Sequence, residues 1–177
     1  MARQYGFLID AERCVDCRAC IVACKAGHSI ELGVSWRRVT TTWKGSYPNV
    51  SFRSQSMACN HCTVPACVNV CPANAISKRS EDGIVVVDRT KCVGCGACGK
   101  ACPYGAPQYG KDGQMQKCDL CLDRVSAGKK PACVQTCPAG ALAFGTMDEL
   151  PKLAGKKAVR QLEGSTGPSV LVSVSEI

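Results

Sequence analysis

Apolar residues in this chain occur in runs of strand length, and the clearest alternating pattern lies near the beginning. In Tyr5–Ile9 the side chains of Tyr5, Phe7 and Ile9 share one face, as in a half-buried strand. Ala141–Phe144 is a second short apolar run, far along the chain. We expect these two segments to pair with each other as the outer strands of one module.

Other elements follow from turns and polar breaks. Ala75–Ser77 and Ile84–Asp88 flank the polar turn Lys78–Gly83 and predict a hairpin. Ser35–Trp43 is rich in β-forming residues and predicts a strand with a loop, in which Trp36 and Trp43 cover a small core, shield a cluster or face a partner. The remaining predictions are short helices over Ala19–Ala26, ended by Gly27, and over Met147–Leu153; an exposed helix and loop over Leu122–Ala132; loops over Pro103–Tyr109 and Gly155–Gly167; and a terminal strand or docking tail over Val170–Val174. No run approaches the roughly 20 apolar residues of a membrane span, so no direct membrane insertion is predicted.

The densest chemistry lies between Cys92 and Pro103. Cysteines at 92, 95, 98 and 102, followed by proline, have the spacing C-x2-C-x2-C-x3-C-P of bacterial ferredoxins. Three close thiolates hold one iron–sulfur cluster, and in two-cluster ferredoxins the fourth ligates the other cluster. Gly94, Gly96 and Gly99 permit the tight turns that bring the backbone near a cluster. This motif, motif III, therefore predicts a partner motif.

Three further motifs have related spacing. Motif I is Cys14, Cys17, Cys20 and Cys24, with Lys25 in place of the proline; motif II is Cys59, Cys62, Cys67 and Cys71, followed by Pro72; motif IV is Cys118, Cys121, Cys133 and Cys137, followed by Pro138. Because four cysteines already serve each motif, His28 and His61 are expected to be packing or surface residues rather than ligands. The prediction is four [4Fe–4S] clusters.

Two other uses of the sixteen cysteines fit less well. A disulfide framework usually spreads its cysteines, whereas these form tight groups. Structural zinc sites use two C-x2-C pairs for each ion, which leaves a ligand over in motifs I and III. Iron–sulfur ligation accounts for every cysteine.

The formal net charge of +8 suggests nucleic acid as a partner only while the clusters are left out. Four thiolates around a cubane core leave a charge of about −2 at each site, or about −8 in total. The excess of lysine and arginine then compensates buried anionic clusters. No nucleic-acid binding is predicted.

The predicted fold class is α+β, with two nested bacterial-ferredoxin-like modules, each with short strands, short helices and two clusters. A compact hairpin joins motifs II and III, so they form one module and motifs I and IV form the other. The expected parts are residues 1–34 and 110–146 (outer module), 35–49 (linker), 50–109 (inserted module) and 147–177 (C-terminal helix and tail). Exchange of the fourth cysteine gives the ligand sets Cys14, Cys17, Cys20 and Cys137; Cys118, Cys121, Cys133 and Cys24; Cys59, Cys62, Cys67 and Cys102; and Cys92, Cys95, Cys98 and Cys71. Pairing motif I with II and motif III with IV is the alternative.

Several runs extend beyond the ligands themselves. Cys-Asn-His-Cys-Thr-Val-Pro-Ala-Cys, Cys-Pro-Tyr-Gly-Ala-Pro-Gln-Tyr, Lys-Cys-Asp-Leu-Cys-Leu-Asp-Arg and Gly-Lys-Lys-Pro-Ala-Cys-Val-Gln-Thr-Cys-Pro resemble the iron–sulfur subunit of dimethyl-sulfoxide-reductase-type molybdoenzymes, over about residues 3–153. The resemblance implies the same nested pairing. It also implies that the outer module faces the catalytic molybdopterin subunit and the inserted module faces the electron donor or acceptor. Some relatives hold a three-iron cluster with Trp where this chain has Cys95.

No Ser–His–Asp set, phosphate loop or paired carboxylates are evident, so the prediction is a non-catalytic electron-transfer subunit of an oxidoreductase complex. Its expected partners are a large molybdopterin-binding subunit and either a membrane anchor or quinone subunit or a soluble electron carrier. The alternatives are a soluble polyferredoxin subunit of a hydrogenase or formate dehydrogenase complex, and a metal-dependent structural or regulatory protein. With no signal segment recognised at its start, the chain is expected to be cytoplasmic, or periplasmic if exported with a signal-bearing partner.

Overall fold

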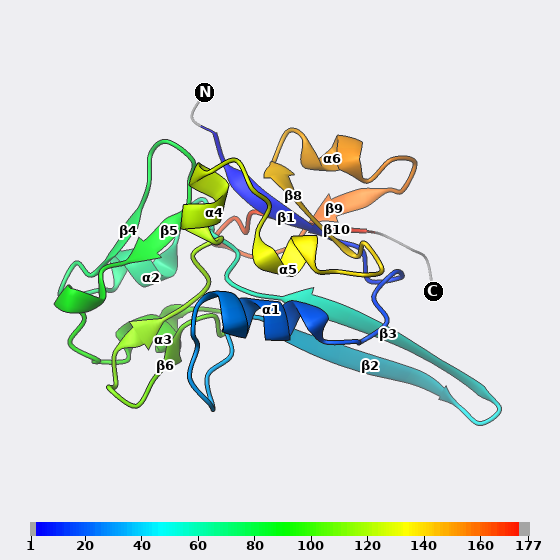
Figure 1. The fold of residues 1–177 in the computed structure, drawn as a ribbon, viewed down its shortest axis with the longest axis horizontal. Helices are drawn as coiled ribbons and strands as arrows, with labels where there is room; N and C mark the ends of the chain where they lie inside the picture. Colours follow the sequence, from blue (N-terminus) through cyan, green and yellow to red (C-terminus); the bar gives the residue numbers. More distant parts are fainter. Residues whose placement is uncertain (1–2, 174–177) are drawn as a thin grey trace.

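The structure is a computed structural model that describes residues 3–173, and its regular elements are short (Figure 1). In chain order they are β1 (Tyr5–Ile9), α1 (Ala19–Gly27), β2 (Arg38–Ser46), β3 (Asn49–Met57), α2 (Ala66–Asn69), β4 (Ile76–Lys78), β5 (Val85–Val87), the 3-10 helix η1 (Arg89–Lys91), α3 (Ala97–Ala101), β6 (Gln108–Tyr109), β7 (Met115–Gln116), α4 (Leu122–Ser126), α5 (Ala132–Gln135), β8 (Leu142–Thr146), α6 (Leu150–Leu153), β9 (Val159–Gln161) and β10 (Val170–Ser173). The fold is α+β, as predicted. None of the helices in residues 3–173 is long and apolar enough to cross a membrane.

Strand β1 occupies the middle of a four-stranded sheet of order β8-β1-β10-β9. It pairs antiparallel with β8, which confirms the predicted pairing of the two outer strands, and parallel with β10. Phe7 and Ile9 face the largest apolar cluster, while Leu8 packs with Leu150 and Leu171 on the other side. The strand is therefore buried on both faces, because α6 covers the face that the alternating pattern left open, where Leu171 of β10 also packs.

The C-terminal segment belongs to this sheet. The expected loop over residues 155–167 is wrong at β9, which pairs antiparallel with β10 and whose mostly exposed side chains carry no apolar signal. Of the two alternatives for residues 170–174, a strand is observed; Val174 lies outside the described residues. The last described strand, β10, thus pairs with the first strand, β1.

A long hairpin replaces the strand and loop expected over Ser35–Trp43. β2 and β3 pair along nine residues each, from Arg38 opposite Met57 to Ser46 opposite Asn49, and the second strand was not predicted. Figure 1 shows this hairpin, here called the arm, extending away from the rest of the molecule. The two tryptophans have different roles, because Trp43 is exposed on the arm whereas Trp36 donates its indole N–H to Gln116 Oε1 at 3.0 Å.

The central part of the chain follows the predictions more closely. The hairpin β4–β5 is confirmed, and the insert between Cys121 and Cys133 is a short helix, α4, and a loop. Helix α1 extends one residue further than predicted, to Gly27, and α6 is shorter than predicted. The predicted loop over Pro103–Tyr109 is wrong at its end, where β6 pairs with β7.

The closest strand packing in the sheet requires glycine at position 6. A Cβ atom there would overlap the backbone carbonyl oxygen of Ser169 and would lie 2.8 Å from Met147 Sδ. We expect Gly6→Ala to lower the free energy of unfolding of the cluster-loaded chain by about 1–3 kcal/mol, because the backbone of Ser169 cannot move without shifting β10. The measurement is the apparent melting temperature, with Gly27→Ala as the matched control, since a Cβ at Gly27 meets only Ala132 Cβ at 3.8 Å. Equal melting temperatures for the two variants would contradict this packing.

Candidate functional site

The fold brings the sixteen cysteines into four groups, each with three members from one motif and one from another. One cavity is lined by Cys71, Cys92, Cys95 and Cys98, a second by Cys59, Cys62, Cys67 and Cys102, and a third by Cys14, Cys17, Cys20 and Cys137. In the fourth group, the electrostatic neighbours of the Cys118 thiol include Cys133 and Cys24, and those of Cys24 include Cys133 and Cys121. Below, each group is named by its first cysteine: the Cys14, Cys24, Cys59 and Cys71 groups.

The donor chemistry of these groups fits an iron–sulfur cluster. All sixteen cysteines carry free thiols, and thiolates are the ligands that such clusters prefer. Burial raises the pKa of Cys24 to about 12, that of Cys67 to about 11 and that of Cys118 well above its usual value. Coordination to a metal deprotonates a thiol outright, so iron would supply the positive charge that these buried sulfur atoms otherwise lack.

A left-handed residue sets the tight turn of the first C-x-x-C pair in every motif. The residue two positions after the first cysteine has a positive φ in all four motifs: Asp16 (52°), His61 (42°), Gly94 (69°) and Leu120 (62°). Only Gly94 adopts this conformation without steric cost, so the other three store backbone strain at the sites. The recurrence indicates that the turn serves the sulfur positions, and it confirms the predicted role of Gly94.

The three Cys-Pro motifs share a second turn. Cys71, Cys102 and Cys137 each accept a hydrogen bond on Sγ from the backbone N–H of the alanine four residues later, at 3.2–3.5 Å. The residue before that alanine is left-handed in each case: Asn74, Gly105 and Gly140. Proline ends the preceding helix, and the left-handed residue turns the next amide back onto the sulfur. Motif I has Lys25 instead, and α1 continues past Cys24.

Each group also has one polar side chain beside a sulfur atom. The contacts are Ser56 Oγ to Cys20 Sγ (3.3 Å), Tyr109 Oη to Cys98 Sγ (3.3 Å), Thr166 Oγ1 donating to Cys62 Sγ (3.2 Å) and His28 Nε2 to Cys121 Sγ (3.2 Å). None of the four was predicted from the sequence, because each partner lies far along the chain or in a segment without a motif.

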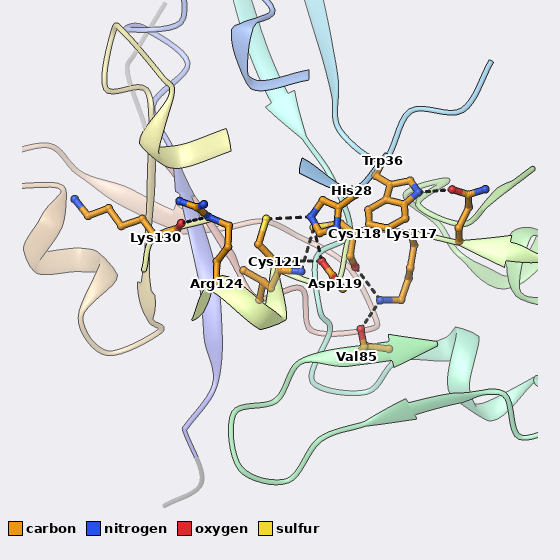
Figure 2. Close-up of polar contacts among 11 residues, drawn as sticks. His28, Trp36, Val85, Lys117, Cys118, Asp119, Cys121, Arg124 and Lys130 are labelled. Carbon is orange, nitrogen blue, oxygen red and sulfur yellow. Dashed lines mark hydrogen bonds and ion pairs between the residues drawn. The ribbon is translucent and has the colours of Figure 1, made fainter. Parts of the chain in front are cut away.

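The two histidines differ in role. Figure 2 shows His28 between Cys121 and Asp119, and its ring also packs against Trp36. His61 is the packing residue that was expected: it is fully buried and its Nδ1 accepts the backbone N–H of Val85 at 3.0 Å. Burial, with the charges of Lys117, Lys78 and Arg37, lowers the pKa of His61 well below its usual value, so the ring is neutral.

Buried cations provide an independent test of the fit. Arg37 and Lys117 are 1% and 3% exposed, and within residues 3–173 neither is paired with a carboxylate. A buried charge requires a compensating charge, and the cysteines beside Arg37 provide one only as thiolates, the form that ligates a cluster. Two atoms of Arg37, Nε and Nη2, have no hydrogen-bond partner in the described chain. An anionic cluster supplies what these side chains lack.

Comparison with known proteins agrees with this chemistry. Residues 50–147 match the family described as a 4Fe-4S dicluster domain, and residues 5–26 match a 4Fe-4S binding domain. The first match includes motifs II, III and IV, and the second includes motif I. Together with the sixteen cysteines, these matches give the chain four [4Fe–4S] clusters.

The sequence is similar to known subunits along most of its length. It is 49% identical over 167 residues to the B subunit of the anaerobic dimethyl sulfoxide reductase of Escherichia coli (strain K12), covering 89% of this chain and 81% of that protein. It is 39% identical to a thiosulfate reductase electron transfer subunit of Salmonella typhi, covering 100% and 95%, and 36% identical to a formate dehydrogenase iron-sulfur subunit of Wolinella succinogenes, covering 90% of each. The chain therefore belongs to the family of dimethyl-sulfoxide-reductase-type iron–sulfur subunits, which transfer electrons within oxidoreductase complexes and are not the catalytic subunits.

Proposed function

We propose that the chain relays single electrons between a molybdopterin-binding catalytic subunit and a second redox partner, which is a membrane anchor or quinone subunit or a soluble electron carrier. The observation that carries this proposal is the gathering of all sixteen cysteines into four groups inside one small fold. A bound [4Fe–4S] cluster accepts and releases one electron at a time. The polypeptide holds the sulfur atoms, aims N–H and O–H groups at them and excludes water.

We propose the exchanged ligand sets, in which the Cys14, Cys24, Cys59 and Cys71 groups each hold one cluster. Support comes from the cavities, three of which are lined by one such group each. The exchange follows from the local turns: a C-x-x-C turn encloses one site, and a short helix carries the motif's last cysteine to the next site.

The nested modules are part of the same proposal. The outer module comprises residues 1–34 and 110–146, and the inserted module comprises residues 50–109. The ladder between β1 and β8 supports the outer module, because it joins the segments before motif I and after motif IV. The hairpin β4–β5 supports the inserted module, because it connects motifs II and III directly. Residues 35–49, expected as a linker, contribute β2 and the turn of the arm, and the tail from residue 147 adds α6, β9 and β10.

The arm is the surface that we assign to the catalytic partner. Trp43 is 66% exposed and Phe52 is 51% exposed, and their ring centroids lie 5.2 Å apart. A two-stranded ribbon is marginally stable alone, and adjacent exposed aromatic rings are typical of protein contacts. Val39 on β2 and Ser56 on β3 line the cavity of the Cys14 group, so a subunit covering the arm lies next to that site. This orientation agrees with the outer module facing the catalytic subunit.

The alternative is a polyferredoxin subunit of a formate dehydrogenase or hydrogenase complex. The similarity to a formate dehydrogenase iron-sulfur subunit supports this alternative. The two assignments share the clusters and differ in the large subunit that binds, so the partner decides between them.

The first prediction from this function concerns metal content and folding. The isolated chain should contain about sixteen iron atoms and about sixteen acid-labile sulfides, four of each for every cluster. Removing the iron should abolish cooperative unfolding, because metal binding supplies much of the folding free energy and Arg37 would be left buried without a counter-charge. Circular dichroism and thermal melting of an iron-free sample provide the measurement. About eight irons in an intact chain, or a native spectrum without iron, would contradict the prediction.

The second prediction tests the exchange of ligands. Cys71→Ser should remove or alter the cluster held by Cys92, Cys95 and Cys98, although Cys71 belongs to motif II. Its matched control is Cys67→Ser, also in motif II, which should affect the Cys59 group instead. Electron paramagnetic resonance of the reduced variants, with the four signals assigned beforehand, separates the two outcomes. The same signal lost in both variants would favour four self-contained sites.

The third prediction tests the function itself. The chain should copurify with a large molybdopterin-binding subunit, and that subunit with its oxidised substrate should reoxidise the dithionite-reduced clusters within single turnovers.

The double variant Trp43→Ala/Phe52→Ala should weaken the complex by tenfold or more, in the range of interface hot spots, while keeping its full iron content. Val22→Ala, at an exposed apolar residue on α1, is the control. Copurification of a nickel–iron subunit would establish the alternative, and unchanged affinity of the double variant would remove the arm from the interface.

A further inference from the structure

The guanidinium of Arg37 is enclosed just before the arm begins. Arg37 is 1% exposed, and its Cζ lies 4.6 Å from the ring centroid of Phe7 on β1. The aromatic ring covers one face of the guanidinium and keeps water from it. The charge therefore acts in surroundings of low dielectric constant, where its field is only weakly screened.

One edge of Arg37 is linked to the Cys14 group. Nη1 donates to the carbonyl oxygen of Ser56 at 3.1 Å and to Ser56 Oγ at 3.2 Å. Ser56 Oγ in turn lies 3.3 Å from Cys20 Sγ. Arginine only donates, so the serine hydroxyl accepts from Arg37 and has its own proton free to donate to a Cys20 thiolate. The charge of Arg37 thus polarises a hydrogen bond that ends on a cluster ligand.

The rest of the guanidinium is electrostatically coupled to a different group. The cysteines that would attract it as thiolates are Cys133, Cys118, Cys20 and Cys24, three of which belong to the Cys24 group. Nε and Nη2 are buried and have no hydrogen-bond partner in the described chain. These two nitrogen atoms of Arg37 are therefore free to donate hydrogen bonds to the sulfur atoms of a bound cluster.

Lys117 is a second buried cation beside the Cys24 group, directly before Cys118 in the sequence. It is 3% exposed, and Nζ donates to the carbonyl oxygens of Val85 and Cys118, the latter at 3.0 Å (Figure 2). Lys117 also lines the cavity of the Cys59 group, and its charge acts on Cys67. It lies between the Cys59 and Cys24 groups, as Arg37 lies between the Cys14 and Cys24 groups.

We propose that Arg37 and Lys117 are fixed cations at two junctions between clusters, and that they raise the reduction potentials of the clusters on either side. The inference rests on the ligand sets proposed above. An electron added to a cluster beside a buried cation is stabilised by a field that solvent does not cancel, and hydrogen bonds to sulfur act in the same direction. Both cations lie beside the Cys24 group, so its cluster receives the largest effect. Neither residue ligates a cluster; each acts on the clusters through the field of its fixed positive charge.

Variants that remove each charge test this assignment, because each should lower the midpoint potentials of a different pair of clusters. Arg37→Gln should lower the midpoint potentials of the Cys14 and Cys24 clusters, and Lys117→Met those of the Cys24 and Cys59 clusters. Each change should reduce the equilibrium constant for one-electron reduction at least tenfold, which corresponds to about 59 mV. Ser56→Ala should lower the potential of the Cys14 cluster alone. Arg160→Gln removes an exposed cation whose partner is Glu163 and is the charge control, with no shift expected.

The readout is a redox titration of the holoprotein followed by electron paramagnetic resonance, with iron content measured in parallel. Full iron content and four unchanged midpoint potentials in Arg37→Gln would overturn the inference and leave the relay function standing. If Arg37→Gln does not load its clusters, Arg37→Lys and Ser56→Ala decide. The charge-retaining Arg37→Lys should keep the potential of the Cys24 cluster, and Ser56→Ala should still lower that of the Cys14 cluster; the opposite result for either variant would refute the assignment. If the unchanged protein itself failed to hold its clusters, that result would instead count against the proposed function.

Discussion

The fold depends on buried cysteine sulfur atoms that the polypeptide alone keeps as neutral thiols and that cluster ligation requires as thiolates. Burial makes the thiolates of Cys24, Cys67 and Cys118 unfavourable, and the same interior contains cations without carboxylate partners among the described residues. A neutral thiol packs readily in an apolar core, but a thiolate or an unpaired cation does not. Anionic clusters resolve both conditions together, which is why the apolar packing, confined to short strands and three small clusters of side chains, is sufficient.

The same requirement shapes the backbone. The first C-x-x-C pair of every motif contains a left-handed residue, and three of these four residues are not glycine. Such strain persists only where the surroundings determine the conformation. The Cys-Pro turns then point an alanine N–H at the sulfur of Cys71, Cys102 and Cys137. Local geometry at the motifs is thus built for the sulfur positions, and the sheet and the arm are built around the motifs.

The sequence predicted most of what depends on neighbouring residues. The cysteine spacing identified the candidate ligands, the apolar runs identified β1, β8 and the β4–β5 hairpin, and the two outer strands paired as expected. What it missed either has no apolar pattern to mark it or depends on contacts between distant segments. β3 pairs with β2 across a two-residue turn but carries mostly polar and exposed residues, and β9, which pairs with β10, is also mostly exposed, so neither has an apolar signal. Arg37 lies in a segment without a motif, and Thr166 reaches Cys62 from more than 100 residues away. Only the folded chain brings these side chains to the clusters.

The central claim is that four clusters occupy four cysteine groups, each completed by a cysteine from another motif. Anomalous diffraction from crystals of the anaerobically purified protein, collected at the iron absorption edge, locates the irons directly. The account predicts four separate iron sites, with Cys137 at the site of Cys14, Cys24 at that of Cys118, Cys102 at that of Cys59 and Cys71 at that of Cys92. Fewer than four sites, or a cluster held by all four cysteines of one motif, would contradict it.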